Sequence, residues 1–182
     1  MRRIILLQSV SLDGYFEGPN HDLSWIEQDY EAFDTRGEYT IDAFLFGHRT
    51  YDLVKAFWST DQGMQTAPEM AKSLTDNVKI VASRVGFEPG WNNVKVITGN
   101  VIGQIRKIKT WPGADLMMFG SNQLVVSLME EGLVDAFQII VRPVAIGKGT
   151  PLFAGLKKRV ALDLKNVNKF KSGAVMLTYE PK

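Results

Sequence analysis

Cysteine is absent from the 182 residues of this chain. Thiol catalysis, disulfide bonds and zinc–thiolate sites are therefore excluded. Only two histidines occur and no compact acidic cluster accompanies them, so we expect no metal site. Because a chain without disulfides fits a reducing compartment, we expect the protein in the cytoplasm.

An excess of charge of either sign is also missing, because 21 basic and 20 acidic residues leave a net charge of +1. The chain therefore has no overall basic field for nucleic acid, and it shows no basic stripe. No apolar run approaches the length that spans a bilayer. The run at residues 4–7 is too short for the core of a signal peptide. We expect a partner that is a small molecule, with neither nucleic acid nor membrane involved.

Common nucleotide and hydrolase signatures are lacking too. Neither G-x-G-x-x-G nor the phosphate loop G-x-x-x-x-G-K-[ST] occurs. There is no G-x-S-x-G elbow, and no histidine stands out as a catalytic base. What the chain does have is a hydrophobic content of 45% and a length that suits a single domain, residues 1–182.

Short apolar runs alternate with helical patterns along most of the chain. Buried strands are predicted at residues 4–7, 43–46, 78–82, 94–97 and 116–119. Further strands are predicted at residues 133–141 (running on towards 146), 160–165 and 174–179. Helices are predicted at residues 22–37, from 48, at 68–74, from 101 and from about 121, with residues 62–66 as a loop. This order predicts an α/β fold whose sheet is mostly parallel, with antiparallel strands at its C-terminal edge.

Some side chains receive a specific prediction from this pattern. Arg106, Lys107 and Lys109 are expected to face solvent near the end of one helix, where cations favour the helix dipole. Leu152 and Phe153 are expected to plug the fold after a glycine-rich loop.

Two of the predicted strands end in a glycine that is followed at once by a helix. Gly120 and Ser121 form one such junction, and Gly47, His48 and Arg49 form the other. The first N–H groups of a helix lack partners within the helix and carry partial positive charge, which suits a phosphate. Taken alone, the junction at Gly120 is more often an ordinary turn with Ser121 as the N-cap.

The other strand ends carry similar chemistry. Ser83 and Arg84 follow one strand, and Thr98 and Gly99 follow the next. In open α/β sheets, ligands bind beyond the carboxyl ends of the strands, so these groups are expected to share one rim. A ligand that contacts all of them would be long and would carry several phosphates. A dinucleotide fits this description, with its pyrophosphate at the helix starts and a 2′-phosphate at the arginines.

The loop at residues 11–18 follows the first strand and contains Asp13 and Gly14. This acidic loop is a candidate edge of an active site, and a plain surface turn is the alternative. Trp25 is a second candidate, because it lies beside the apolar stripe of its predicted helix and could line a pocket. Packing in the core is the alternative for Trp25.

Several ordered segments resemble the dihydrofolate reductase-like superfamily. They are Ser11-Leu-Asp-Gly14, Phe46-Gly-His-Arg-Thr-Tyr51, Ile80-Val-Ala-Ser-Arg84, Met118-Phe-Gly-Ser121, Gly132-Leu-Val-Asp135, and then Pro143, Gly147-Lys-Gly149 and Leu152-Phe153. The chain is most similar to the branch that contains the C-terminal reductase domain of the riboflavin-biosynthesis deaminase/reductase. The resemblance covers nearly the whole chain. It implies three layers, a mostly parallel mixed sheet of about eight strands with helices on both faces, NADPH as cofactor, and often a homodimer.

The resemblance also implies roles for individual residues. The cofactor-binding residues would be Gly47, His48, Arg49 and Thr50 at the phosphate turn, Ser83 and Arg84 beside the adenosine ribose phosphate, Thr98 near the adenine, and Gly120, Ser121, Asn122 and Gln123 at the pyrophosphate. On the substrate side it would place Gly14, Phe16 and Trp25, with Asp13 as the catalytic polar group or proton relay.

Two positions depart from the family pattern. His48 replaces an arginine and so removes a permanent positive charge, and Ser121 replaces a second glycine and so adds a side chain beside the pyrophosphate. Arg49 and Arg84 are available to compensate. The resemblance implies an NADPH-dependent reductase of a small heterocyclic or carbonyl substrate, with a pyrimidine- or pterin-like class among the options. The two departures motivate the alternative, a ligand-binding module of the same fold without turnover.

Overall fold

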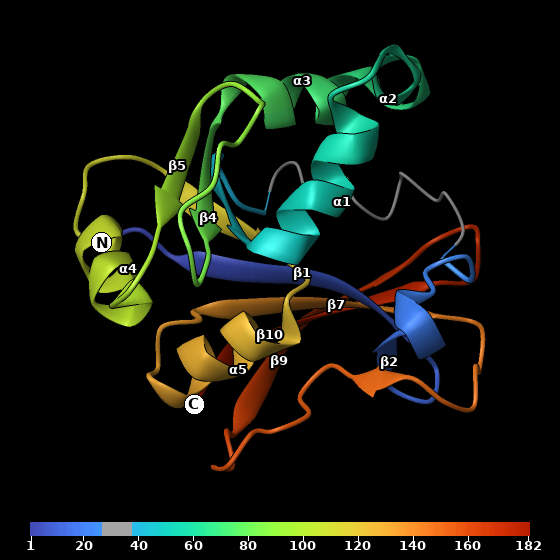
Figure 1. Ribbon diagram of the computed structural model, residues 1–182. Coiled ribbons are helices and arrows are strands. Elements are labelled where there is room, and N and C mark those ends of the chain that lie inside the picture. The colour runs from blue at the N-terminus through green and yellow to red at the C-terminus, as the bar shows by residue number, and fades with distance from the viewer. Residues whose placement is uncertain (27–37) are drawn as a thin grey trace.

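One large sheet organises the part of the chain described by this computed structural model, residues 1–26 and 38–182. Its eight strands have the order β5-β4-β3-β6-β1-β7-β10-β9 (Figure 1). In that order their bounds are Val94–Ile97, Val78–Ala82, Ile41–Gly47, Asp115–Phe119, Ile4–Ser11, Ala136–Arg142, Val175–Pro181 and Leu162–Lys169. The first six strands run parallel, and β10 and β9 add antiparallel pairs at one edge. The mostly parallel mixed sheet predicted from the sequence is confirmed.

Each face of the sheet carries its own hydrophobic core, because successive side chains of a strand point to opposite sides. In β1, which is buried along its whole length, Ile4 and Leu6 belong to one core, while Ile5 and Leu7 belong to the other. The first core includes residues of α4 and α5, and the second includes residues of α1 and α3. The bounds of these helices are His48–Trp58 for α1, Pro68–Asp76 for α3, Val101–Lys109 for α4 and Asn122–Glu130 for α5. The fold therefore has the three layers that the resemblance implied.

The prediction of a loop at residues 62–66 is wrong, because these residues lie in a short helix, α2 (Asp61–Thr66). Thr60 caps this helix by accepting a hydrogen bond from the Gly63 N–H at 3.3 Å. An added Cβ at Gly63 would lie 2.5 Å from the Phe57 carbonyl oxygen. The glycine that reads as a loop signal is thus required by a close contact between α1 and α2.

The helix predicted at residues 22–37 does not begin at Asp22. A 3₁₀ helix, η1 (Pro19–His21), comes first, and the chain then turns at Ser24 and Trp25, where Trp25 Nε1 donates to the Asp22 carbonyl at 3.1 Å. The remainder of that prediction, residues 27–37, lies outside the described residues.

A second, two-stranded sheet joins distant parts of the chain and was not predicted. It pairs β2 (Tyr15–Glu17) with β8 (Thr150–Pro151). The backbone at Gly149 packs directly on the Glu17 carbonyl, which leaves no room for a side chain. Such short strands have no readable periodicity, so only the closed fold reveals the pair.

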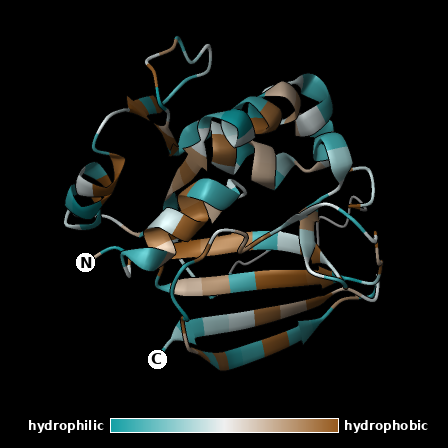
Figure 2. Ribbon diagram, turned by 60° about the horizontal axis from the view of Figure 1, so that its bottom comes forward, coloured by the Kyte–Doolittle hydropathy of each residue, from teal (hydrophilic) through white to brown (hydrophobic). Residues whose placement is uncertain are grey.

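The C-terminal strands form the solvent-facing edge of the sheet. β7 ends at Arg142 and does not continue towards residue 146, since Pro143 has no N–H to donate to a ladder. β9 and β10 form a hairpin whose turn includes Gly173, at φ +85°. In Figure 2 the outermost strand, β9, alternates between hydrophilic and hydrophobic bands. Residues 164–167 are nevertheless all exposed, so both faces of this edge strand reach solvent. Of the two expected plug residues, Leu152 is buried and Phe153 is exposed.

The prediction that Lys109 faces solvent is also wrong. Its side chain is buried at the end of α4, where Nζ donates to the Leu133 carbonyl at 2.9 Å and forms an ion pair with Asp135. Asp135 also accepts the Ile4 N–H at 2.7 Å. The Lys109–Asp135 pair therefore ties α4 to the starts of β1 and β7.

Two negative findings hold for residues 1–26 and 38–182. No helix there is long and apolar enough to cross a membrane. No group of three histidine, aspartate or glutamate side chains there could hold a metal ion.

Lys79 is a fully buried cation in β4. Its Nζ donates to the carbonyl oxygens of Leu74 at 2.5 Å, Asn77 at 3.0 Å and Thr75 at 3.2 Å, and so closes the C-terminal end of α3. Burial lowers the pKa of Lys79 from 10.5 to about 8. Between these two values the unfolded chain binds more protons than the folded chain, so this residue adds stability as the pH rises through that window.

We therefore expect the free energy of unfolding of the wild type to rise relative to that of Lys79→Met between pH 8 and 10.5. The expected slope of the difference is up to about 1 kcal/mol per pH unit. Urea denaturation of both proteins across this window measures it. Parallel pH profiles would contradict the expectation.

Candidate active site

A cavity of about 920 Å³ lies where β3, β4, β5 and β6 end. Gly47, Ser83, Gly99 and Ser121, which follow or end these four strands, all line it. Because the strands are parallel neighbours, their carboxyl ends meet at one edge of the sheet, where α/β folds bind ligands. The structure thus brings the separate strand ends together as predicted.

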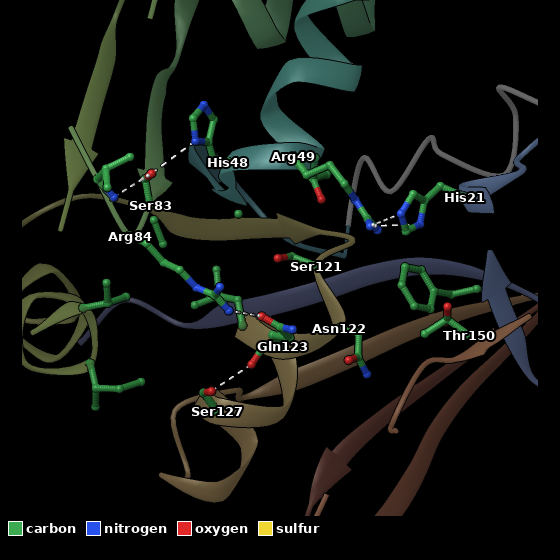
Figure 3. A pocket seen from close by; sticks show the side chains of 18 of the residues that line it. His21, His48, Arg49, Ser83, Arg84, Ser121, Asn122, Gln123, Ser127 and Thr150 are labelled. Carbon is green, nitrogen blue, oxygen red and sulfur yellow. Dashed lines mark hydrogen bonds between the residues drawn. The ribbon is translucent and has the colours of Figure 1, made fainter. Parts of the chain in front are cut away.

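Most of the residues expected to bind a cofactor lie around this cavity. The predicted residues that line it are Phe16, Gly47, His48, Arg49, Thr50, Ser83, Arg84, Ser121, Asn122 and Gln123 (Figure 3 labels seven of them). Gly120 lines an adjoining pocket instead. Thr98 is not among the lining residues; its carbonyl accepts a hydrogen bond from Gln104 at 2.6 Å, and the neighbouring Gly99 takes its place.

Two helices begin at the cavity without a side-chain cap. Gly47 precedes α1 and Ser121 precedes α5, and neither start has a capping hydrogen bond from a side chain. The first N–H groups of both helices therefore remain available to an acceptor from outside the helix. Together with the helix dipoles, they make this edge suitable for an anion.

The two arginines of the cavity are in different electrostatic situations. Arg49 Nη2 lies 2.6 Å from Glu17 Oε2, and its Nη1 lies 2.9 Å from His21 Nδ1 (Figure 3). Arg84 Nη2 donates to a neutral partner, Gln123 Oε1, at 3.0 Å. None of the ion pairs between described residues involves Arg84. Arg84 is thus the guanidinium whose charge is not offset by a carboxylate at this site.

Glu17 is a buried carboxylate at the cavity that sequence reasoning did not single out. It accepts hydrogen bonds from Arg49 and from Thr150 Oγ1 at 2.9 Å, and His21 Nδ1 lies 3.1 Å from it. The acidic loop at residues 11–18 was a partial signal. The pairing of β2 with β8, which places Glu17 beside Thr150, has no local signature in the sequence.

His48, which stands where the family pattern has an arginine, is held by its neighbours. Its ring stacks on Phe87 with centroids 3.8 Å apart, and its Nδ1 lies 3.2 Å from Ser83 Oγ. Asp52 Oδ2 lies 3.5 Å from the other ring nitrogen. His48 therefore links the end of β4 to the start of α1.

Ser121 is the second departure, and its backbone is in the left-handed region at φ +60°. This conformation favours glycine. The Ser121 side chain packs against the α-carbon of Gly47, where an added Cβ would lie 2.9 Å from Ser121 Cβ and still closer to its Oγ. The two helix starts are thus in direct contact at the floor of the site.

Asn122 and Gln123 bind neighbouring segments. Asn122 Nδ2 donates to the carbonyl oxygens of Leu152 at 2.7 Å and Ala154 at 3.1 Å, which holds the segment after β8 against α5. Gln123 holds Arg84, so the predicted residues support one another across the cavity.

A smaller pocket of about 270 Å³ adjoins the polar cavity. The two share four lining residues, Phe16, Glu17, Arg49 and Thr50. Aromatic and aliphatic side chains form most of the described lining of the smaller pocket. A larger cavity with many polar side chains in its lining thus meets a smaller apolar pocket at a common wall.

Besides Thr98, three predicted residues are not among those that line either cavity: Asp13, Gly14 and Trp25. Asp13 is exposed, and its carboxylate accepts the N–H groups of Gly147 at 2.7 Å and Ile146 at 3.1 Å. Hydrogen bonds from Ser11 and from these two amides lower the pKa of Asp13. This geometry favours the alternative reading, in which Asp13 holds two loops together.

Comparison with known proteins gives a family. The sequence matches the RibD C-terminal domain over residues 2–176. It is 34% identical to the uncharacterized protein YyaP of Bacillus subtilis (strain 168), over 98% of this chain and 94% of that one. It is 27% identical to the uncharacterized protein YwjB of the same organism, over 98% of this chain and 97% of that one.

Solved structures share the fold at lower identity. A protein from Shewanella sp. PV-4, named for riboflavin biosynthesis, has a TM-score of 0.72 at 20% identity, covering 100% of this chain and 99% of its own. The diaminohydroxyphosphoribosylaminopyrimidine deaminase/5-amino-6-(5-phosphoribosylamino)uracil reductase of Thermotoga maritima has a TM-score of 0.70 at 14% identity, and this chain spans 57% of it. The fold is dihydrofolate reductase-like, and the chain belongs to the RibD C-terminal domain family.

Proposed function

We propose that this protein is an NADPH-dependent oxidoreductase that transfers a hydride to a small heterocyclic or carbonyl substrate. Membership of a reductase-type family indicates an oxidoreductase. The observation that carries the finer proposal is the polar cavity at the strand ends, where two uncapped helix starts and Arg84 face one space.

The residues present fit the phosphates of a dinucleotide. The starts of α1 and α5 would hold the pyrophosphate, since free N–H groups and dipoles favour an anion there. Arg84 and Ser83 would hold the 2′-phosphate, because a guanidinium offers a planar fork of donors to phosphate oxygens. Gly47 has no side chain, and this lets Ser121 pack against it and holds the two helix starts together.

The chain itself would orient the reactants. When bound, NADPH would supply a hydride to the substrate carbon and become NADP⁺, and the attached oxygen or nitrogen would take a proton from water. Phe16 and Thr50, in the wall common to the two cavities, would separate and align the two reactants. Glu17 and Arg49 would keep this wall in place through their ion pair.

Calorimetric titration with NADPH, NADP⁺ and NADH tests the cofactor. NADPH and NADP⁺, which carry the 2′-phosphate, are expected to bind at least about tenfold more tightly than NADH, as one charge-assisted contact would provide. No heat at millimolar concentration of any of the three would reject the proposal.

Arg84→Ala is expected to weaken NADPH binding by roughly 10- to 100-fold and to leave NADH binding nearly unchanged, because only NADPH carries the 2′-phosphate. Arg106→Ala is the matched control, since Arg106 is an exposed arginine that pairs with Glu131 outside the cavity lining. Equal losses for the two dinucleotides would refute the role of Arg84.

A ligand-binding module of the same fold without turnover remains a second candidate, because His48 and Ser121 depart from the family pattern at the two helix starts. Tight dinucleotide binding without hydride transfer to any of a broad panel of carbonyl, imine and pterin compounds would favour it.

A homodimer, which the resemblance implies, is a separate proposal that sedimentation equilibrium tests.

A further inference from the structure

The apolar pocket beside the polar cavity carries information about the substrate. Its volume of about 270 Å³ is near the lower limit for small-molecule sites, roughly 300 Å³. It would therefore hold a ring system and little more. Its described walls include these aromatic and aliphatic side chains: Phe16, Leu53, Val54, Trp58, Met70 and Phe119.

Two polar side chains of this pocket, Gln8 and Ser9, already have partners. Gln8 Oε1 accepts the Gly120 N–H at 2.8 Å, and Gln8 Nε2 donates to the Ser9 carbonyl at 3.1 Å. Ser9 Oγ accepts from Arg142 Nε at 3.2 Å. A ligand with many polar groups would lose its hydration here without regaining an equal number of hydrogen bonds.

The charges in the described lining cancel. Glu17 and Arg49 are the charged residues among the described side chains that line the pocket, and they pair at 2.6 Å. A phosphate or carboxylate on the ligand would have to compete with buried Glu17 for the Arg49 guanidinium. It would also draw Arg49 away from the buried Glu17 carboxylate, and a buried charge that loses its partner is unfavourable.

We propose that this pocket takes an uncharged, planar, largely apolar ring compound, a quinone or an aromatic carbonyl or imine, and rejects phosphorylated or carboxylated ones. This differs from the phosphoribosylated uracil in the name of the Thermotoga maritima protein. As a statement about the substrate, the assignment rests on the proposed function. Its carbon–oxygen or carbon–nitrogen double bond would receive the hydride and proton of the reaction given above.

Two probes with the same ring test the assignment: naphthoquinone, which is uncharged, and naphthoquinone sulfonate, which is an anion. Because the chain has no cysteine, thiol addition to the quinone does not occur. Calorimetry without dinucleotide and with saturating NADP⁺ gives both dissociation constants independently of turnover. The uncharged probe is expected to bind at least about tenfold more tightly than the sulfonate.

A cation placed in the wall of the apolar pocket should reduce the preference for the uncharged probe over the sulfonate. Leu53 lines the pocket and is 50% exposed, so Leu53→Lys places a charge there without emptying the core. We expect it to lower the preference by about fivefold, as a partly exposed ion pair would. Leu164→Lys is the matched control, because Leu164 is 52% exposed in β9 and does not line the pocket.

The outcomes separate the two proposals. If the uncharged probe binds with the expected preference while NADPH gives no heat, the proposed function falls and the ligand class of the pocket stands. If NADPH binds but the sulfonate binds as tightly as the quinone, the ligand class is overturned. Failure of both probes to bind, or an equal response of Leu53→Lys and Leu164→Lys, overturns it as well.

Discussion

Gly47→Ala is expected to weaken NADPH binding by at least about tenfold. The backbone of Gly47 is extended, at φ −77° and ψ 157°, so alanine is not strained there by its own conformation. The new methyl group would instead press on the side chain of Ser121 and displace the start of α5 from that of α1. Overpacking of this kind costs about 1–3 kcal/mol, and here it falls on the two helix starts assigned to the pyrophosphate.

Removing the Ser121 side chain should restore binding. In Gly47→Ala/Ser121→Gly the clashing atoms are gone, and glycine readily adopts the left-handed conformation at position 121. We expect the double variant to bind NADPH within about threefold of the wild type, so the two substitutions should be strongly non-additive.

Calorimetric titration of NADPH into the wild type, Gly47→Ala, Ser121→Gly and the double variant gives the coupling free energy between positions 47 and 121. Gly86→Ala is the control for a glycine-to-alanine substitution that creates no new contact, because an added Cβ there meets no atom within 4 Å. Additive losses in the double variant would show that Gly47 acts on binding by some route other than its contact with Ser121.

Asp135→Ala is expected to lower the free energy of unfolding by about 3 kcal/mol. The substitution leaves the buried ammonium of Lys109 without its carboxylate and removes the acceptor of the Ile4 N–H. Breaking one partner of a buried ion pair is strongly destabilising, because the other charge stays buried without compensation. The exposed edge of Asp135 keeps the expectation at the lower end of the range for such pairs.

An exposed pair nearby provides the comparison. Glu131 pairs with Arg106, and both side chains are about half exposed. Glu131→Ala should therefore change stability by less than about 1 kcal/mol. Urea denaturation of the two variants and the wild type measures the difference. Equal effects of the two substitutions would contradict the assignment of Lys109 as a buried, paired cation.

Much of the fold could be predicted because its signals are local. The apolar runs predicted β3, β4, β5 and β6, and the glycines at 47 and 120 predicted where helices follow strands. The parallel order then placed Gly47, Ser83 and Ser121 at one rim without any knowledge of contacts. Local patterns carried this far because hydrophobic periodicity reports directly which face of an element is buried.

Predictions from local patterns were wrong where a residue makes a contact with a distant part of the structure. Polar residues and a glycine read as a loop at 62–66, although Gly63 is required by a contact between helices. Lys109 was predicted to be an exposed cation because its carboxylate partner, Asp135, lies 26 residues further along the chain. Neither partner can be identified before the chain closes.

The amino-acid sequence by itself determined the layered α/β architecture, the strand ends that form the rim, and the absence of thiol chemistry. The tertiary structure alone decided how the charges at the rim are distributed. The pairing of β2 with β8 places Glu17 beside Thr150, and the packing of α1 against β2 brings Arg49 to Glu17 and leaves Arg84 as the arginine without a carboxylate. The same residues of β2 and α1 form the wall between the apolar pocket and the polar cavity. These contacts join residues far apart in the chain, and no periodic pattern encodes them, because their geometry exists only after the sheet has formed.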